Sequence, residues 1–331
     1  MEYRKLGTSD LSLSVITFGA WAAGGWMWGG TERNGAVEAI RAAYEMGVTS
    51  IDTAPVYGQG LSEEIVGEAI RHIPRDKVQI LTKFGMKWDA AKGALAFKTK
   101  NNEEKEIDVY KYAGKDSIIQ ECETSLRLLG TDYIDLYQLH WPDVTTPIQE
   151  TMEALSQLIR QGKIRYAAVC NYNVDQMKEA ARWIDLVSNQ VPYSMVKRGI
   201  EADTVPYCID HHKSILAYSP LERGLLTGKI GPGHQFAEGD HRKNLPFYKD
   251  ENIRRTNDFL NRIKPLADQK GASLSQLVLR WTIGQPGITI ALAGARNAAQ
   301  SIQNAKATEI KLSEEEISFI NGELAKLDLV K

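Results

Sequence analysis

Cysteine is scarce in this sequence. Only three cysteines stand among its 331 residues, at Cys122, Cys170 and Cys208. A sparse and odd count argues against a disulfide framework and is typical of a reducing compartment, so we expect a cytoplasmic protein. No two of these cysteines have the spacing of zinc ligands, and the sequence predicts no metal site.

An excess of charge of one sign is also missing. The chain has 40 Lys and Arg against 42 Asp and Glu. Polyphosphate partners usually bind a basic excess or a basic patch. The lysine-rich stretch 92–105 also carries Glu103 and Glu104, and we interpret it as a solvated loop. We therefore expect no nucleic-acid partner.

One uncharged run, residues 11–31, has the length of a membrane span or a signal peptide. Its composition argues against both. It contains five glycines, and Asp10 interrupts the basic start made by Arg4 and Lys5. Residues 11–15 alternate apolar and polar side chains, as a half-buried strand does. We expect no membrane association.

The chain repeats one unit, a short apolar run followed by an amphipathic helical pattern. Residues 3–6 and 11–15, joined by the turn at 7–10, predict an N-terminal β-hairpin. The eight strands that we then predict cover residues 15–18, 50–52, 78–82, 133–139, 164–169, 186–191, 214–218 and 288–292. Eight alternating units in a chain of this length predict a (β/α)₈ TIM barrel, which we expect to form one domain over residues 1–331. The alternative is a doubly wound open sheet, but no Gly-x-Gly-x-x-Gly follows the first strand.

Two connections are unusually long. Residues 85–116 follow the third strand and residues 221–251 follow the seventh. Both leave the carboxyl ends of strands, where barrel enzymes build their sites, and loops of such length are often functional. The second loop is long enough to fold over a bound cofactor.

Four side chains at strand ends form a candidate acid–base unit. Asp52 closes the second strand and Tyr57 follows it, Lys83 follows the third strand, and His140 follows the fourth. Taken singly, each of these residues has a common structural role. An Asp at a strand end often caps a turn, a Tyr in a loop often packs against its neighbours, and a His is more often structural than catalytic. Together they suit proton transfer, because an ammonium anchored by a carboxylate lowers the pKa of a nearby phenol from about 10.

The same residues resemble the signature of the aldo-keto reductase family. The segment from Asp52 to Gly58, followed by Lys83 and His140, carries this resemblance. Further matches lie at 162–172, 218–229 and 294–304, and they extend the resemblance over nearly the whole chain. The sequence is also similar to bacterial reductases grouped with inositol- and stress-related members. It departs from the family's usual residues at Cys170, where Ser is common.

The resemblance implies the roles of individual residues. Tyr57 would be the proton donor in reduction, tuned by Lys83 and Asp52, and His140 would orient the carbonyl. The residues implied to bind the cofactor are Gly19, Ala20, Trp21, Cys170, Asn171, Gln190, Tyr218, Ser219, Pro220, Leu221, Arg223, Gly224, Lys229, Gly294, Ala295, Arg296, Gln300, Gln303 and Asn304. The aromatic residues implied to meet the substrate are Trp21, Trp26, Trp88 and Trp141.

Arg296 is the reason to expect NADP(H). A guanidinium matches a phosphate through paired, charge-assisted hydrogen bonds, and the N-terminus of the helix that follows also attracts phosphate. The expected activity is hydride transfer between NADP(H) and a small-molecule aldehyde, ketone or sugar. Two alternatives stay open: a sugar or polyol dehydrogenase that runs the same chemistry in reverse, and a cofactor-sensing regulatory subunit with little turnover. The sequence leaves the oligomeric state open.

Overall fold

The computed structural model describes residues 1–330; Lys331, the last residue of the predicted domain, lies outside the described residues. Eight parallel strands close into a barrel in the order β10-β11-β12-β13-β3-β4-β5-β9. Their bounds are β3 (Ile16–Gly19), β4 (Ser50–Asp52), β5 (Gln79–Phe84), β9 (Ile134–Leu139), β10 (Ile164–Cys170), β11 (Ser188–Pro192), β12 (Ser214–Tyr218) and β13 (Ile288–Ala293). The predicted (β/α)₈ barrel is confirmed. Strand β5 runs two residues further than predicted and therefore contains Lys83.

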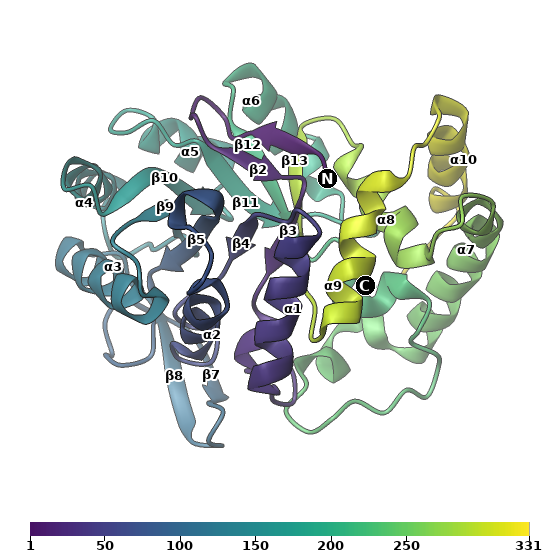
Figure 1. Cartoon of the computed structure of the whole chain (residues 1–331), viewed down its shortest axis with the longest axis horizontal. Coiled ribbons are helices and arrows are strands. Elements are labelled where there is room, and N and C mark those ends of the chain that lie inside the picture. Colours follow the sequence, from purple (N-terminus) through teal and green to yellow (C-terminus); the bar gives the residue numbers. More distant parts are fainter. Residues whose placement is uncertain (331) are drawn as a thin grey trace.

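The helices form the outer layer (Figure 1). They are α1 (Arg33–Glu45), α2 (Leu61–Ile70), α3 (Lys115–Leu129), α4 (Ile148–Arg160), α5 (Val174–Ala180), α6 (Thr204–Asp210), α7 (Asp250–Gln269), α8 (Leu274–Ile283), α9 (Ala298–Ala305) and α10 (Glu314–Leu324). Each strand is covered on its outer face by helices and on its inner face by other strands, which explains the nearly unbroken apolar runs. Ser313 and Glu316 form a capping box at the N-terminus of α10. Within residues 1–330, no helix combines the length and apolar character needed to cross a lipid bilayer.

The N-terminal hairpin pairs β1 (Tyr3–Lys5) with β2 (Ser12–Ser14) in antiparallel register, as predicted. Leu6 and Leu13 are fully buried against Leu81, Leu136 and other inward-facing barrel residues. The hairpin therefore plugs the barrel with leucine side chains.

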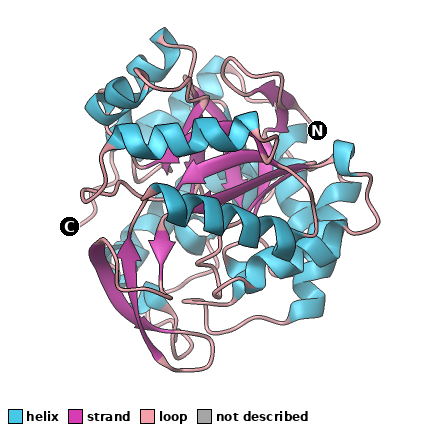
Figure 2. Ribbon diagram, turned by 90° about the vertical axis from the view of Figure 1, so that its left-hand side faces the viewer, coloured by secondary structure: helices cyan, strands magenta, loops and turns pink. Residues whose placement is uncertain are grey.

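The connection after β5 is a small antiparallel sheet rather than a loop. Its strands are β6 (Met86–Lys87), β7 (Ala94–Lys100) and β8 (Glu106–Lys111), in the order β6-β8-β7. We call residues 86–111 the arm; it stands apart from the barrel strands in Figure 2. The prediction of a solvated loop over 92–105 is wrong for residues 94–100, which form β7, whereas 101–105 connect β7 to β8. Within β7, Lys98 and Lys100 alternate with the more buried Phe97 and Thr99, which is a strand pattern.

The connection after β12 is also ordered. It contains three short 3₁₀ helices, η4 (Glu222–Thr227), η5 (His241–Asn244) and η6 (Pro246–Tyr248). Leu225, Ile230, Tyr248 and Ile253 form its own buried cluster, and the Tyr248 hydroxyl donates to the carbonyl of Glu222 at 2.6 Å.

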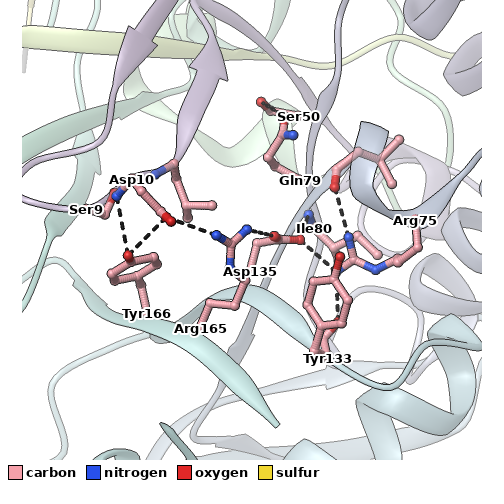
Figure 3. A network of polar contacts seen from close by, with 12 residues as sticks. Ser9, Asp10, Ser50, Arg75, Gln79, Ile80, Tyr133, Asp135, Arg165 and Tyr166 are labelled. Carbon is pink, nitrogen blue, oxygen red and sulfur yellow. Dashed lines mark hydrogen bonds and ion pairs between the residues drawn. The ribbon is translucent and has the colours of Figure 1, made fainter. Parts of the chain in front are cut away.

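A buried carboxylate, Asp135, ties β5, β9 and β10 together (Figure 3). Its side chain is 2% exposed. It accepts from Arg75 Nη2 at 2.6 Å, from the Ile80 backbone at 2.9 Å and from Arg165 Nη1 at 3.1 Å. Arg165 also binds Asp10 of the hairpin turn, at 2.9 Å. This network holds the hairpin to the barrel wall.

We expect Asp135→Asn to lower the free energy of unfolding by about 3 kcal/mol, because it leaves a partly buried guanidinium without its counter-charge. Urea unfolding measures this change. The matched control is Asp132→Asn, since Asp132 is exposed three residues away. A loss for Asp135→Asn no larger than for the control would contradict the role given to the network.

Candidate active site

The carboxyl ends of the barrel strands surround a cavity of about 630 Å³. Almost all of the residues predicted for the site line it. Those lining the cavity are Gly19, Trp21, Trp26, Asp52, Tyr57, His140, Trp141, Cys170, Asn171, Gln190, Tyr218, Ser219, Pro220, Leu221, Arg223, Gly224, Lys229, Gly294, Ala295, Arg296, Gln300, Gln303 and Asn304. Segments more than 250 residues apart in sequence thus share one cavity.

Three predicted residues do not line it. Lys83 is fully buried behind Asp52 and Tyr57. Ala20 is also fully buried, and its carbonyl accepts from the Ser62 hydroxyl at 2.9 Å. Trp88 packs against the apolar cluster at the base of the arm. Neither Ala20 nor Trp88 faces the cavity where a cofactor or substrate would lie.

Lys83 is the centre of the acid–base unit. Its Nζ donates to Asp52 Oδ1 at 2.5 Å, to the carbonyl of Thr53 at 2.8 Å and to the Tyr57 hydroxyl at 3.4 Å. These three acceptors use the three N–H bonds of the ammonium, as a fully buried lysine requires.

Asp52 is held from two further sides. Its Oδ2 accepts from Gln138 Nε2 at 3.0 Å and from Gln190 Nε2 at 2.8 Å. The Gln190 amide nitrogen also lies 3.1 Å from Gln138 Oε1. Sequence reasoning missed Gln138, because its inward orientation depends on the register of β9 beside β5.

Tyr57 is positioned by its aromatic neighbours and by a close backbone contact. Its ring stacks on Trp21, with centroids 6.0 Å apart, and meets His140 edge-on at 5.6 Å. A Cβ added at Gly24 would lie 2.5 Å from the Tyr57 carbonyl oxygen. Only glycine at position 24 allows the loop after β3 to pack this tightly against the Tyr57 segment.

Burial dominates the electrostatics of the unit. It raises the pKa of Tyr57 to about 12, against the opposing charge of Lys83. Lys83 lowers this pKa, as expected, but desolvation of the phenolate outweighs the effect of the ammonium. Burial is also the largest single influence on Lys83 and opposes its charged form, but Asp52, Tyr57 and Cys170 together outweigh burial and raise the pKa of Lys83. Burial, followed by Lys83, holds the pKa of His140 well below its usual value. At neutral pH Tyr57 is a phenol and His140 is uncharged.

Asn171 joins the acid–base unit to the other half of the cavity. It follows β10 with a positive φ of 60°, a conformation that Asn tolerates better than most residues. Its Nδ2 donates to the His140 carbonyl at 3.1 Å, and its Oδ1 accepts from the Tyr218 hydroxyl at 3.0 Å. The amide of Asn171 thus links the ends of β9, β10 and β12.

The loop after β12 has features that suit a phosphate-bearing ligand. Ser219, Glu222 and Arg223 all have positive φ, and such strain concentrates at ligand sites. Arg223 Nε is buried and has no hydrogen-bond partner within residues 1–330. Its Nη1 pairs with Glu222 at 3.6 Å, but the unpartnered Nε fits an anion at this place, so the residues are compatible with a dinucleotide.

Arg296 lines the same cavity from the loop after β13. Its Nη2 donates to the carbonyl of Trp28 at 2.7 Å, and its guanidinium lies 5.5 Å from the Trp28 ring. Arg242, which sequence reasoning missed, lies 5.0 Å from the same ring and is paired with Asp240 at 2.6 Å. Gln300 holds the backbone of Arg296 in place, because its Oε1 accepts a hydrogen bond from the Arg296 backbone N–H at 2.8 Å. Cationic side chains from two loops therefore meet beside Trp28.

The model of the aldo/keto reductase family matches residues 15–323. Two curated relatives resemble the chain over most of its length. Aldo-keto reductase YhdN of Bacillus subtilis is 39% identical over 97% of this chain and 93% of its own. The NADH-specific methylglyoxal reductase of Escherichia coli is 36% identical over 97% of both chains.

Solved structures agree with this match. A glycerol dehydrogenase from Gluconobacter oxydans superposes with a TM-score of 0.88 and 36% identity, covering 98% of this chain and 95% of that one. An aldo/keto reductase from Klebsiella pneumoniae, solved with NADP and acetate, has a TM-score of 0.71 and 31% identity, with 98% of each chain covered.

Proposed function

The chain belongs to the aldo/keto reductase family, and from this premise we propose that it is an NADP(H)-dependent oxidoreductase that reduces aldehydes and ketones to alcohols with Tyr57 as proton donor. The observation that carries the proposal is the Lys83 ammonium, which is fully buried between Asp52 at 2.5 Å and the Tyr57 hydroxyl at 3.4 Å. This arrangement suits a site that gives a proton to an oxygen as negative charge develops on it.

The protein's own residues would handle the proton and the orientation of the substrate. The phenol of Tyr57 holds its proton at neutral pH, because burial raises its pKa to about 12. Lys83 stabilises the phenolate left after the proton moves to the substrate oxygen, and Asp52 keeps Lys83 in place. The uncharged imidazole of His140 orients the carbonyl without competing as an acid. When bound, the nicotinamide supplies the hydride.

The cofactor would be held on the other side of the cavity. We assign the nicotinamide to Asn171 and Tyr218, and the pyrophosphate to the loop after β12 with Arg223. Arg296, with Arg242 beside it, would meet the 2′-phosphate that distinguishes NADP(H) from NAD(H). Charge complementarity supports this assignment, because both guanidinium groups meet at Trp28.

We expect Arg296→Ala to weaken NADPH binding roughly 10- to 100-fold, the value of a pair of charge-assisted hydrogen bonds. NADH, which lacks the 2′-phosphate, would bind almost unchanged. Titration of protein fluorescence with each cofactor measures both constants. The matched control is Arg254→Ala, since Arg254 is exposed on α7. Equal losses for NADPH and NADH would remove Arg296 as the basis of cofactor preference.

The reaction itself is tested with a panel of aldehydes, ketones and sugars, following NADPH and NADH absorbance. Faster turnover of carbonyls with NADPH supports the proposal. Faster sugar or polyol oxidation would favour a dehydrogenase, and tight NADPH binding with no turnover would favour a regulatory subunit.

We also propose a cytoplasmic location. Cys122, Cys170 and Cys208 are free thiols, and all three are buried. Free thiols are typical of a reducing compartment.

A further inference from the structure

The interior of the barrel carries a polar layer that borders the cavity. Asp52, Gln138 and Gln190 come from β4, β9 and β11, which are alternate strands of the closed barrel. Alternate strands supply the side chains of one interior layer, and all three of these side chains are buried. Leu136, two residues before Gln138 on the same face of β9, belongs to the apolar cluster of the barrel interior. A glutamine therefore stands where barrel interiors usually carry an apolar residue.

Hydrogen bonds join the three side chains into a closed ring. Gln138 Nε2 and Gln190 Nε2 both donate to Asp52 Oδ2, at 3.0 Å and 2.8 Å. Gln190 Nε2 also donates to Gln138 Oε1 at 3.1 Å. An ionised carboxylate can only accept, so both amides must turn their nitrogens toward Asp52, and neither can flip without losing its bonds. The ring thus has a single arrangement of donors and acceptors.

The two oxygens of Asp52 have different partners. Oδ1 accepts from the Lys83 ammonium at 2.5 Å, whereas Oδ2 accepts from the two amides. A buried ion pair is stable only when its remaining lone pairs are also satisfied. An amide satisfies Oδ2 without bringing a second positive charge that would compete with Lys83 for the carboxylate.

The orientation of Asp52 controls the position of the Lys83 ammonium. Of the three acceptors of Lys83 Nζ, Asp52 Oδ1 is the nearest, at 2.5 Å, and the Tyr57 hydroxyl is the farthest, at 3.4 Å. If the carboxylate rotated, Nζ would follow its nearest partner. The contact with Tyr57 would be lost first, because it is already at the long end of the hydrogen-bond range.

We propose that Gln138 is a positioning residue for proton transfer, which acts by fixing the carboxylate of Asp52. Asp52 in turn keeps the Lys83 ammonium beside the Tyr57 hydroxyl. Gln138 is fully buried and does not line the cavity, so it would touch neither cofactor nor substrate. This inference rests on the proposed function, because it assumes that Tyr57 gives the proton.

The first test is Gln138→Met in the full-length protein, which keeps the length of the side chain but removes its donor and its acceptor. The kcat for reduction of 4-nitrobenzaldehyde with NADPH should fall by about 10- to 100-fold, the value of one hydrogen bond to a charged group. The dissociation constant of NADPH, measured by fluorescence titration, should stay nearly unchanged, because Gln138 lies outside the cavity lining.

The second test is Gln138→Glu, with kcat measured as a function of pH. A protonated carboxyl reproduces the ring, because its hydroxyl donates to Asp52 and its other oxygen accepts from Gln190. Most of the wild-type rate should therefore remain at low pH. The rate should fall as the added acid ionises, since two like charges then share one site. The charged groups joined to this position by hydrogen bonds are Asp52 and, through it, Lys83. A merely structural role would not produce this additional step in the pH profile.

The matched control is Gln285→Met, which makes the same chemical change at another buried glutamine. Gln285 follows α8, does not line the cavity, and donates through Nε2 to the carbonyl of Trp281 at 2.9 Å. Its loss should lower the free energy of unfolding, as measured with urea, but leave kcat and the pH profile unchanged. Comparison with Gln138→Met thus separates the loss of a buried amide from the loss of the bond to Asp52.

The outcomes separate this inference from the function on which it rests. A wild-type kcat in Gln138→Met would overturn the inference and leave the reductase function intact. So would an equal loss of kcat in Gln285→Met, or a pH profile of Gln138→Glu that runs parallel to that of wild type. If Gln138→Met does not fold, the pH profile of Gln138→Glu decides. Absence of turnover by the wild-type protein with every carbonyl and with both cofactors would overturn the proposed function itself.

Discussion

Tyr57→Phe is expected to lower kcat for carbonyl reduction by about 10²–10⁴-fold, the contribution of a well-placed general acid. The change removes one hydroxyl from a ring that stays packed between Trp21 and His140. NADPH affinity should stay nearly unchanged, because the hydroxyl is bound by Lys83 and not by the residues assigned to the cofactor. Initial rates with 4-nitrobenzaldehyde and fluorescence titration with NADPH measure the two quantities.

The matched control for this variant is Tyr44→Phe, since Tyr44 lies on α1 at the outside of the barrel. It loses the same hydroxyl far from the cavity and should reduce the aldehyde normally. Normal reduction by Tyr57→Phe would show that the proton comes from another group, and the proposed mechanism would then be wrong.

Lys83→Met is expected to abolish turnover and to destabilise the fold by roughly 3–5 kcal/mol, because removing one partner leaves a buried charge uncompensated. Lys83 is fully buried and Asp52 is 3% exposed, so water cannot replace the missing ammonium. The loss of the ammonium also raises the pKa of Tyr57 further, since Lys83 is the charge that lowers it. Any residual alcohol oxidation, which needs the phenolate, should therefore shift to higher pH. Urea unfolding and a pH–rate profile measure the two effects.

A second variant separates stability from chemistry. In Lys83→Met combined with Asp52→Asn both charges are gone, so part of the lost stability should return while turnover stays absent. The control is Lys77→Met, because Lys77 is exposed and its pair with Asp76 lies on the surface. Turnover in the double variant near the wild-type rate would contradict the role assigned to the pair.

The barrel was predictable because each of its strands and helices has a pattern of apolar residues that is visible in a short stretch of sequence. Parallel strands covered on both faces appear as apolar runs, and the helices between them carry a 3.6-residue pattern. The arm was not predicted, because the many charged residues of 92–105 are typical of a loop, although Lys98 and Lys100 alternate with the more buried Phe97 and Thr99. That error concealed Phe97, which lines the cavity.

By itself the sequence determined which side chains stand at the strand ends. Asp52, Tyr57, Lys83 and His140 follow or close successive strands, and parallel strands in a barrel bring those ends to one face. The tertiary structure alone decided how these groups behave. The pKa of Tyr57 depends on the balance between desolvation and the charge of Lys83, and burial comes from packing of the whole chain. The hydrogen bond from Arg296 to Trp28 likewise joins residues 268 positions apart in the sequence. Such a contact forms only when the barrel closes, and the local sequence around either residue does not predict it.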